Sequence, residues 1–142
     1  MDKTTLTDFY AKKNVPDSGY AGGVYDVARL LNLRPVRTWM GARRDRRVSV
    51  ADVGCGRGAF LADLLARMQA RHAVGCARAI GIDFVHYEPN QFGRIPPEVF
   101  QFASADLDGG QLPLDDNSMD IMACNHVLEH VFHTERLARE MT

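Results

Sequence analysis

The segment Val48–Leu61, which reads VSVADVGCGRGAFL, constrains the fold of this chain more than any other. An apolar, β-branched run leads into a turn with glycine at alternate positions, and a helix-forming run follows the turn. The glycines are Gly54, Gly56 and Gly58. A strand, a glycine-rich turn and a helix in this order form the start of a nucleotide-binding βα unit. Glycine suits such a turn because it accepts positive φ and lets a ligand approach the backbone closely.

Further apolar runs downstream predict more strands, so that strands and connecting segments alternate. We predict strands over 48–53, 79–82, 99–103 and 119–124, and a helix over 58–70. Such alternation implies a parallel sheet with right-handed crossovers. The predicted fold class is therefore α/β, a Rossmann-like, doubly wound and mostly parallel sheet with helices before it.

Other segments carry weaker helix signals. Apolar positions at helical spacing predict a helix from residue 22 to about 33 and a shorter one around Trp39. A short helix is also expected within residues 84–93, and Thr134 is expected to cap a final helix.

Two regions follow from this pattern. Residues 1–47 are expected to form an N-terminal arm and helical cap, with the arm over 1–20, and residues 48–142 the ligand-binding domain. At 142 residues the chain is long enough to bury a core of its own.

Composition narrows the classes of function. A formal net charge of −1 excludes a strong overall positive field toward nucleic acid or a membrane surface. The basic cluster from Arg43 to Arg47 is expected to be a solvated linker rather than a phosphate site. The three cysteines have no metal-binding spacing, and no apolar run is long enough for a signal peptide or a membrane span. These features favour a cytoplasmic protein with free thiols.

The ligand is expected at the carboxyl ends of the strands, where open parallel sheets bind their ligands. The glycine turn, Asp83, Asp106 and Asn125 each follow a different predicted strand. The turn alone also fits the dinucleotide pattern G-x-G-x-x-G/A, so a nicotinamide-dependent oxidoreductase is an alternative.

Two carboxylates favour another ligand. Asp52, two residues before the first glycine, is unfavourable for a pyrophosphate at the helix N-terminus and favourable for an ammonium group. Asp106 can accept a hydrogen bond from an exocyclic amine, and Asp83 can hold a ribose diol through charge-assisted hydrogen bonds. An amino-acid tail, a ribose and an adenine without phosphate describe S-adenosylmethionine.

Four motifs in order resemble those of class I S-adenosylmethionine-dependent methyltransferases. Asp52–Gly58 resembles the first motif, Ile80–Asp83 the second, and Ala105–Leu107 with Leu112-Pro113 the third. The segment from Asp120 through Asn125 to Val131 is similar to the fourth-strand signature of the small-molecule and ubiquinone/menaquinone-type branch. The resemblance implies a methyl transfer from S-adenosylmethionine to a small-molecule acceptor.

The resemblance also implies roles for individual residues. Asp52 would lie near the ammonium group, Asp83 would bind the ribose, and Phe84 would pack on the adenine. Asp106 and the Leu107 backbone would read the adenine edge. The implied cofactor-binding set is Asp52, Gly54, Cys55, Gly56, Gly58, Asp83, Phe84, Asp106, Leu107 and Asn125.

The segment His126–His130 also spells H-x-x-E-H, an inverted zinc-peptidase motif. That function needs both histidines on one helical face and a third ligand, and few candidates remain downstream, so we expect no metal. Either His126 or His130 is a candidate general base for a substrate hydroxyl. Packing near the cofactor is the favoured role for both.

The family's sheet has seven strands, and this chain carries motifs for the first four only. A C-terminally truncated domain is therefore expected, with strand 119–124 at an exposed apolar edge. Self-association or a completing partner at this edge is expected, and a non-catalytic cofactor-binding or interaction module is an alternative function.

Overall fold

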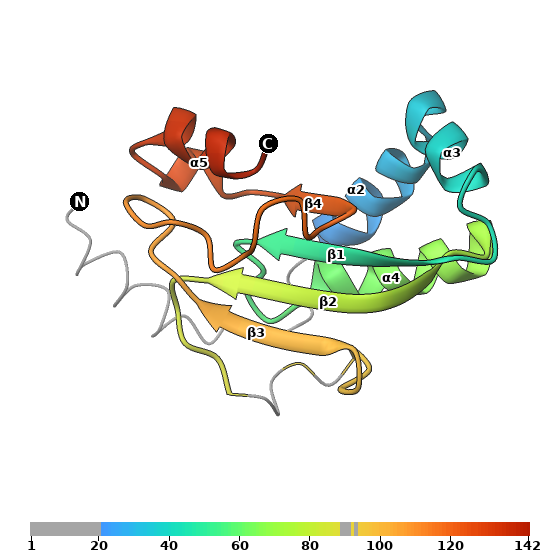
Figure 1. Cartoon of the computed structure of the whole chain (residues 1–142), viewed down its shortest axis with the longest axis horizontal. Coiled ribbons are helices and arrows are strands. Elements are labelled where there is room, and N and C mark those ends of the chain that lie inside the picture. Colours follow the sequence, from blue (N-terminus) through green and yellow to red (C-terminus); the bar gives the residue numbers. More distant parts are fainter. Residues whose placement is uncertain (1–20, 89–91, 93) are drawn as a thin grey trace.

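The computed structural model describes residues 21–88, 92 and 94–142. Its centre is a four-stranded parallel sheet in the order β3-β2-β1-β4, and all strands have their carboxyl ends at the same edge (Figure 1). The strands are β1 (Arg47–Val53), β2 (Gly75–Asp83), β3 (Phe100–Ser104) and β4 (Ile121–Cys124). The helices are α2 (Ala21–Asn32), α3 (Arg34–Gly41), α4 (Ala59–His72), the 3-10 helix η3 (Leu128–His130) and α5 (Thr134–Glu140).

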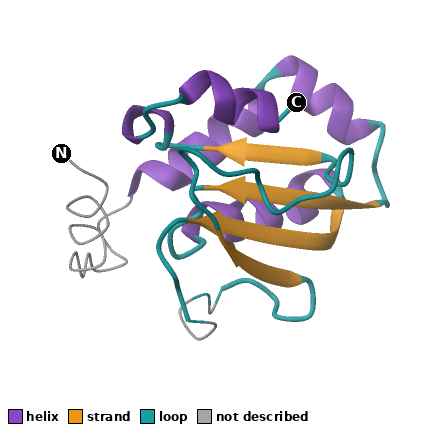
Figure 2. Ribbon diagram, turned by 60° about the vertical axis from the view of Figure 1, so that its left-hand side comes forward, coloured by secondary structure: helices purple, strands orange, loops and turns teal. Residues whose placement is uncertain are grey.

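Alternation of side chains along the strands produces two hydrophobic clusters, one on each face of the sheet. On one face, Val48 and Val50 of β1 pack with the apolar sides of α2, α3 and α4. On the other face, Val53 and Ile82 pack with Leu137 of α5 and with loop residues. Helices on both faces of a parallel sheet confirm the predicted Rossmann-like α/β fold (Figure 2).

β1 lies between β2 and β4, which is why the glycine turn that follows it sits at the centre of the carboxyl edge. Val50, Ala51 and Val53 are fully buried. Val53 is in register with Ile82 of β2 and with Cys124 of β4. The ends of the three strands therefore converge on the turn.

Two strands differ in length from the prediction. β2 begins at Gly75 rather than at residue 79, because pairing with Arg47 and Val48 extends it through residues that form no apolar run. β4 begins at Ile121 rather than at residue 119. Asp120, just before it, already binds β1, since its amide donates to the Ser49 carbonyl and its carboxylate accepts from the Ser49 amide at 2.8 Å.

Four of the predicted helices are present, whereas one short helix is not found in the described residues and one predicted cap is wrong. The helices around residues 22–33, Trp39 and 58–70 and the final helix are present as α2, α3, α4 and α5. The described residues of the 84–93 segment form no helix. Thr134 does not cap α5, because the N-cap residue is His133 and its side chain makes no capping hydrogen bond.

The predicted arm over 1–20 lies outside the described residues. Residues of the basic cluster form a turn between α3 and β1, which confirms the expected connecting segment. Arg43 stacks on the Trp39 ring at 3.7 Å, and Arg47 donates to the Cys76 carbonyl. Among the described helices, none combines the length and apolar character that a membrane span requires.

Candidate cofactor site

The glycine turn connects β1 to α4 and is fastened to β2. The amides of Gly54 and Cys55 donate to the Ile82 carbonyl at 2.7 and 3.0 Å. Gly54, Gly56 and Gly58 have φ values of 78°, 51° and 76°, which L side chains rarely adopt. The sequence prediction that this turn needs glycine is therefore confirmed by the backbone.

The first and third glycines are also required by packing. A Cβ atom at Gly54 would collide with the side chain of Val127, which comes from the segment after β4. A Cβ atom at Gly58 would lie 2.8 Å from Ile95 and 3.2 Å from Phe92. Both glycines let distant segments close over the turn.

Gly56 differs from its two neighbours in the turn. A Cβ atom built on Gly56 has no heavy atom within 4 Å among the described residues outside its own neighbours. Its amide points instead at Asp83, whose Oδ2 atom accepts the hydrogen bond at 2.8 Å. The open side of the turn at Gly56 is thus the place where a ligand can approach the backbone.

Asp52 lies at the end of β1 with a side chain that is 2% exposed. Burial first, and then the charge of Asp83, raise the pKa of Asp52 from 3.8 to about 8. Its Oδ2 atom is buried without a hydrogen-bond partner in the described structure. A buried carboxyl oxygen without a donor is costly, so this atom calls for a ligand that donates hydrogen bonds.

Asp83 lies at the end of β2 and joins three loops at the carboxyl edge. Besides Gly56, it accepts a hydrogen bond from the Val85 amide at 3.0 Å, and its carbonyl accepts from Ala105 at 2.9 Å. Burial raises the pKa of Asp83, while these hydrogen bonds to Val85 and Gly56 act in the opposite direction. The carboxylate therefore fixes the glycine turn and the loop after β2 to each other.

The loop after β3 supplies one buried and one exposed acid. Asp106 is exposed, and its Oδ1 atom accepts from the Asp108 amide at 3.0 Å in a local turn. The Leu107 side chain is buried in the hydrophobic cluster that contains Val53 and Ile82. Asp108, which sequence reasoning missed, accepts hydrogen bonds from the amides of Phe132 and His133 at 2.6 and 3.0 Å.

Asp108 thereby holds the segment that leads into α5, and does not cap the first turn of the helix. Its carboxylate satisfies the two amides just before α5 and places negative charge near the helix N-terminus, which the helix dipole favours. No sequence pattern signals this role, since the acid lies 25 residues before His133.

The residues after β4 lie beside the turn. Asn125 follows β4 directly and is half-buried, and Val127 packs against Gly54. His126 has a φ of 55°, and its Nδ1 atom lies 3.5 Å from a Glu129 carboxylate oxygen. His126 lies before η3 and His130 ends it, so the two do not share one face of a regular helix as the zinc-peptidase motif requires. The described residues contain no group of three or more side chains placed to hold a metal ion.

An aromatic cluster borders the site on the β3 side. Phe84 is half-buried directly after Asp83. Tyr87, which sequence reasoning did not single out, has its pKa raised to about 12, first by burial and then by the charge of Asp83. Its ring meets Phe92 and Phe102 edge-on, each at 6.0 Å between centroids. An aromatic ring near Asp83 could have been suspected from the tyrosine four residues later, but only the loop geometry brings it there.

The structure thus brings most of the predicted set together. The turn residues Gly54, Cys55 and Gly56 are hydrogen-bonded to the end of β2. Cys55 is buried, and burial together with the charges of Asp52 and Asp83 raises the pKa of its thiol. A neutral, buried thiol is a packing group rather than a nucleophile.

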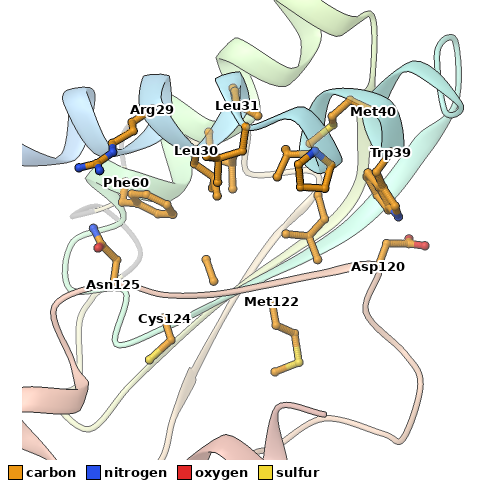
Figure 3. A pocket seen from close by; sticks show the side chains of 16 residues that line it. Arg29, Leu30, Leu31, Trp39, Met40, Phe60, Asp120, Met122, Cys124 and Asn125 are labelled. Carbon is orange, nitrogen blue, oxygen red and sulfur yellow. The ribbon is translucent and has the colours of Figure 1, made fainter.

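A separate cavity of about 840 Å³ lies on the other side of β4, between that strand and helices α2, α3 and α4 (Figure 3). Asn125 is the one member of the predicted set that lines it. The rest of the lining is mostly apolar, with Phe60 and Leu64 of α4 among it. This cavity is thus distinct from the turn.

The segment that contains the glycine turn matches a known protein family. A family model described as "Methyltransferase domain" matches residues 51–142, more than half of the chain. Among curated proteins, none matches.

Three solved structures share the fold at 17 to 22% identity. The first, from the complex between the Haloferax volcanii Trm112 methyltransferase activator and a methyltransferase, is 17% identical with a TM-score of 0.53, and the match covers 95% of this chain and 53% of that one. The [4+2]-cyclase SpnF is 22% identical with a TM-score of 0.51, and the match covers 75% of this chain and 39% of the cyclase. The YcgJ protein from Bacillus subtilis is 21% identical with a TM-score of 0.51, and the match covers 75% of this chain and 43% of YcgJ.

The chain spans about half or less of the length of these three structures, and at this identity the likeness shows the fold alone. The family match and the fold agree with each other. The chain belongs to the methyltransferase domain family, of the class I type whose members use S-adenosylmethionine.

Proposed function

We propose that this protein binds S-adenosylmethionine at the glycine turn and takes part in methyl transfer to a small-molecule acceptor. The observation that carries the proposal is the buried Asp52 carboxyl, whose Oδ2 atom has no donor among the described residues. An ammonium group is a donor that also stabilises the ionised carboxylate. A pyrophosphate would instead place negative charge beside Asp52 and Asp83.

The residues present fit such a ligand. The open side of Gly56 lets the methionine part approach the backbone, and Asp52 would receive its ammonium group. Asp83 retains lone pairs beyond its two amide hydrogen bonds and would accept from the ribose hydroxyls. We assign the remaining predicted residues in the same way, with Asp106 and the Leu107 backbone toward the adenine edge, Phe84 against its ring, and Cys55, Gly58 and Asn125 along the turn.

Tyr87 adds to this assignment. Its ring lies near enough to Asp83 for that charge to raise its pKa, on the side where the ribose and adenine are placed. We propose that Tyr87 and Phe84 share the task of covering the adenine. Stacking on an aromatic ring suits any flat base without a special hydrogen-bond pattern.

When bound, S-adenosylmethionine supplies a methyl group bonded to a sulfonium sulfur, and an acceptor nucleophile can attack the carbon of that methyl group. The contribution of the protein is then mostly positioning. His126 and His130 are exposed beside the turn, and either would serve as a base for an acceptor that must lose a proton. We place the protein in the cytoplasm and, by its fourth-strand signature, in the small-molecule and ubiquinone/menaquinone-type branch.

We also propose that this chain has a protein partner, without naming which protein it is. One structural neighbour was solved in a complex with a methyltransferase activator, so an activating partner is a reasonable expectation for this chain. A non-catalytic cofactor-binding module remains the second candidate. It is favoured by one structural neighbour that is named as a cyclase and not as a methyltransferase.

Direct titration tests the proposal. The purified chain should bind S-adenosylmethionine and its demethylated product saturably, and more tightly than NAD. Asp83→Ala should abolish binding, whereas Asp116→Asn, an exposed loop acid, should leave it unchanged. Preference for NAD, or no binding by a folded chain, would contradict the proposal. Turnover of any acceptor by this chain alone would eliminate the non-catalytic module.

A further inference from the structure

The segments that follow the four strands are joined to one another by contacts at the carboxyl edge. The Gly56 amide joins the turn after β1 to Asp83, at the end of β2. The Asp83 carbonyl accepts a hydrogen bond from the Ala105 amide, in the loop after β3. The segment after β4 reaches the turn again, because Val127 packs against Gly54. A link between the loop after β3 and the segment after β4 closes this series.

Asp108 makes that link. Its Oδ1 atom accepts hydrogen bonds from the amides of Phe132 and His133 at 2.6 and 3.0 Å. The strand order β3-β2-β1-β4 places β3 and β4 on either side of β2 and β1, about 14 Å apart at the usual strand spacing. Asp108 therefore joins segments from both sides of the two strands that end in the cofactor site, those of Asp83 and Asp52.

The link lies at a buried position. Asp108 is only 9% exposed, and hydrogen bonds from amides to a carboxylate are stronger than those to a neutral acceptor. Leu107 precedes Asp108 directly, and Val127 lies five residues before Phe132. Both are buried in the same hydrophobic cluster. Apolar contacts and hydrogen bonds thus hold the two segments together at one place.

In the proposed function, the two segments serve different halves of the ligand. Asp106 and the Leu107 backbone, just before Asp108, are assigned to the adenine. Asn125 and Val127, in the other segment, lie beside the turn that is assigned to the methionine part. Asp108 itself is assigned no contact with the ligand. A shift between the two segments would change the distance between the adenine side and the methionine side of the site.

We propose that Asp108 is a positioning residue, which fixes this distance so that both halves of S-adenosylmethionine bind at once. The inference rests on the proposed function. When one half of a ligand is bound, binding of the other half becomes intramolecular, and its benefit depends on how well the two sites are spaced. Asp108 should therefore contribute to the gain in affinity that the whole ligand has over its adenosine half.

Calorimetric titration with two ligands measures this gain. S-adenosylhomocysteine, the demethylated product, contains both halves, and 5′-methylthioadenosine contains the adenosine half without the amino acid. The gain is the ratio of the two dissociation constants. Asp108→Ala should lower it by about tenfold, mainly through weaker binding of the whole ligand. A variant that is merely less folded would lose binding-competent protein for both ligands alike, and its ratio would not change.

Two further variants serve as controls. Asp108→Asn keeps the Oδ1 acceptor and should retain the gain to within about threefold. Glu140→Ala removes another carboxylate that ties α5 to the same loop, since Glu140 Oε2 accepts from the Leu112 amide at 3.2 Å. This second tie is farther along both segments from the residues assigned to the ligand. Glu140→Ala should therefore leave the gain unchanged.

Hydrogen exchange of the wild type provides a second arm that needs no variant. The amides of Phe132 and His133 should exchange at least about threefold more slowly when 5′-methylthioadenosine saturates the protein, because Asp108 transmits the ordering of the loop after β3. Unchanged exchange at both amides, or an equal ratio in Asp108→Ala and wild type, would overturn the inference and leave the proposed function standing. If neither ligand binds the wild type, the proposed function fails and the inference falls with it.

Discussion

The amide of Gly56 donates a hydrogen bond of 2.8 Å to the carboxylate of Asp83, which fastens the glycine turn after β1 to the end of β2. The same carboxylate accepts from Val85, so one side chain holds two loops of the cofactor site in place. A residue expected to bind the ribose is thereby also a structural part of the turn. A substitution of Asp83 can therefore weaken ligand binding in two ways, by removing a ligand contact or by disrupting the glycine turn, and an experiment has to distinguish them.

Asp83→Asn makes that separation. An asparagine keeps the shape of the side chain and one acceptor oxygen. The free energy of unfolding of the variant should therefore lie within about 1 to 2 kcal/mol of the wild-type value. Affinity for S-adenosylmethionine should fall by about ten- to a hundredfold, because hydrogen bonds to a charged group contribute more than neutral ones. Denaturant unfolding and calorimetric titration measure the two quantities. Equal affinity of Asp83→Asn and wild type would remove Asp83 from the ribose site.

Burial of Asp52 makes the stability of the cofactor-free protein depend on pH. Its pKa is raised from 3.8 to about 8, so the folded state holds a proton that the unfolded state releases between these values. The free energy of unfolding should therefore be highest below about pH 4, fall as pH rises toward 8, and level off above it. Asp83, whose pKa is also raised by burial, contributes in the same direction.

Asp52→Asn should remove most of this dependence. The variant carries no ionisable group at the site, and it should be more stable than the wild type at about pH 8 by an amount on the order of a few kcal/mol. Urea denaturation at several pH values measures the slope. Asp116→Asn, at an exposed position, should retain the slope of the wild type. An unchanged slope in Asp52→Asn would show that Asp52 is ionised in the folded protein.

The glycines of the turn should respond differently to alanine. Gly54→Ala adds a collision with Val127 to the cost of a positive φ, and should destabilise the protein by about 3 kcal/mol or more. Gly56→Ala carries only the cost of its φ of 51°, about 1 kcal/mol, because the space beside it is open. Chemical denaturation of both variants checks the order. Similar losses in the two would mean that Val127 does not pack on the turn.

Asp108 should control the start of α5. Asp108→Ala removes the acceptor of the Phe132 and His133 amides, and should cost about 2 to 3 kcal/mol. Asp108→Asn retains an oxygen and should cost less. Hydrogen exchange of amides in α5 reports the effect locally, with faster exchange in the alanine variant. Exchange at wild-type rates in Asp108→Ala would show that α5 is held by Leu137 packing alone.

The parts of the fold that follow local rules could be predicted from the sequence. Glycine at 54, 56 and 58 signals a turn with positive φ, and the apolar runs before Asp52 and Asp83 signal buried strands. Once parallel strands are assumed, topology brings their carboxyl ends together without further information. The position of Asp52 and Asp83 at one edge followed from these rules.

Other features depend on contacts between distant segments. Val127 packs on Gly54, and Asp108 holds the two residues that precede a helix beginning 26 residues later, at Thr134. β2 extends to Gly75 because β1 offers it a partner, although its first residues resemble a loop. Thr134 makes no cap because it is itself the first residue of α5, and His133 occupies the N-cap position.

The central claim is that the buried Asp52 carboxylate receives the ammonium group of S-adenosylmethionine. Calorimetric titration of wild type and Asp52→Asn with two ligands tests it most directly: S-adenosylmethionine, and 5′-methylthioadenosine, which has the adenosine part without the amino acid. The variant should bind S-adenosylmethionine about ten- to a hundredfold more weakly and 5′-methylthioadenosine with wild-type affinity. Unchanged affinity for S-adenosylmethionine, or an equal loss for both ligands, would contradict the account.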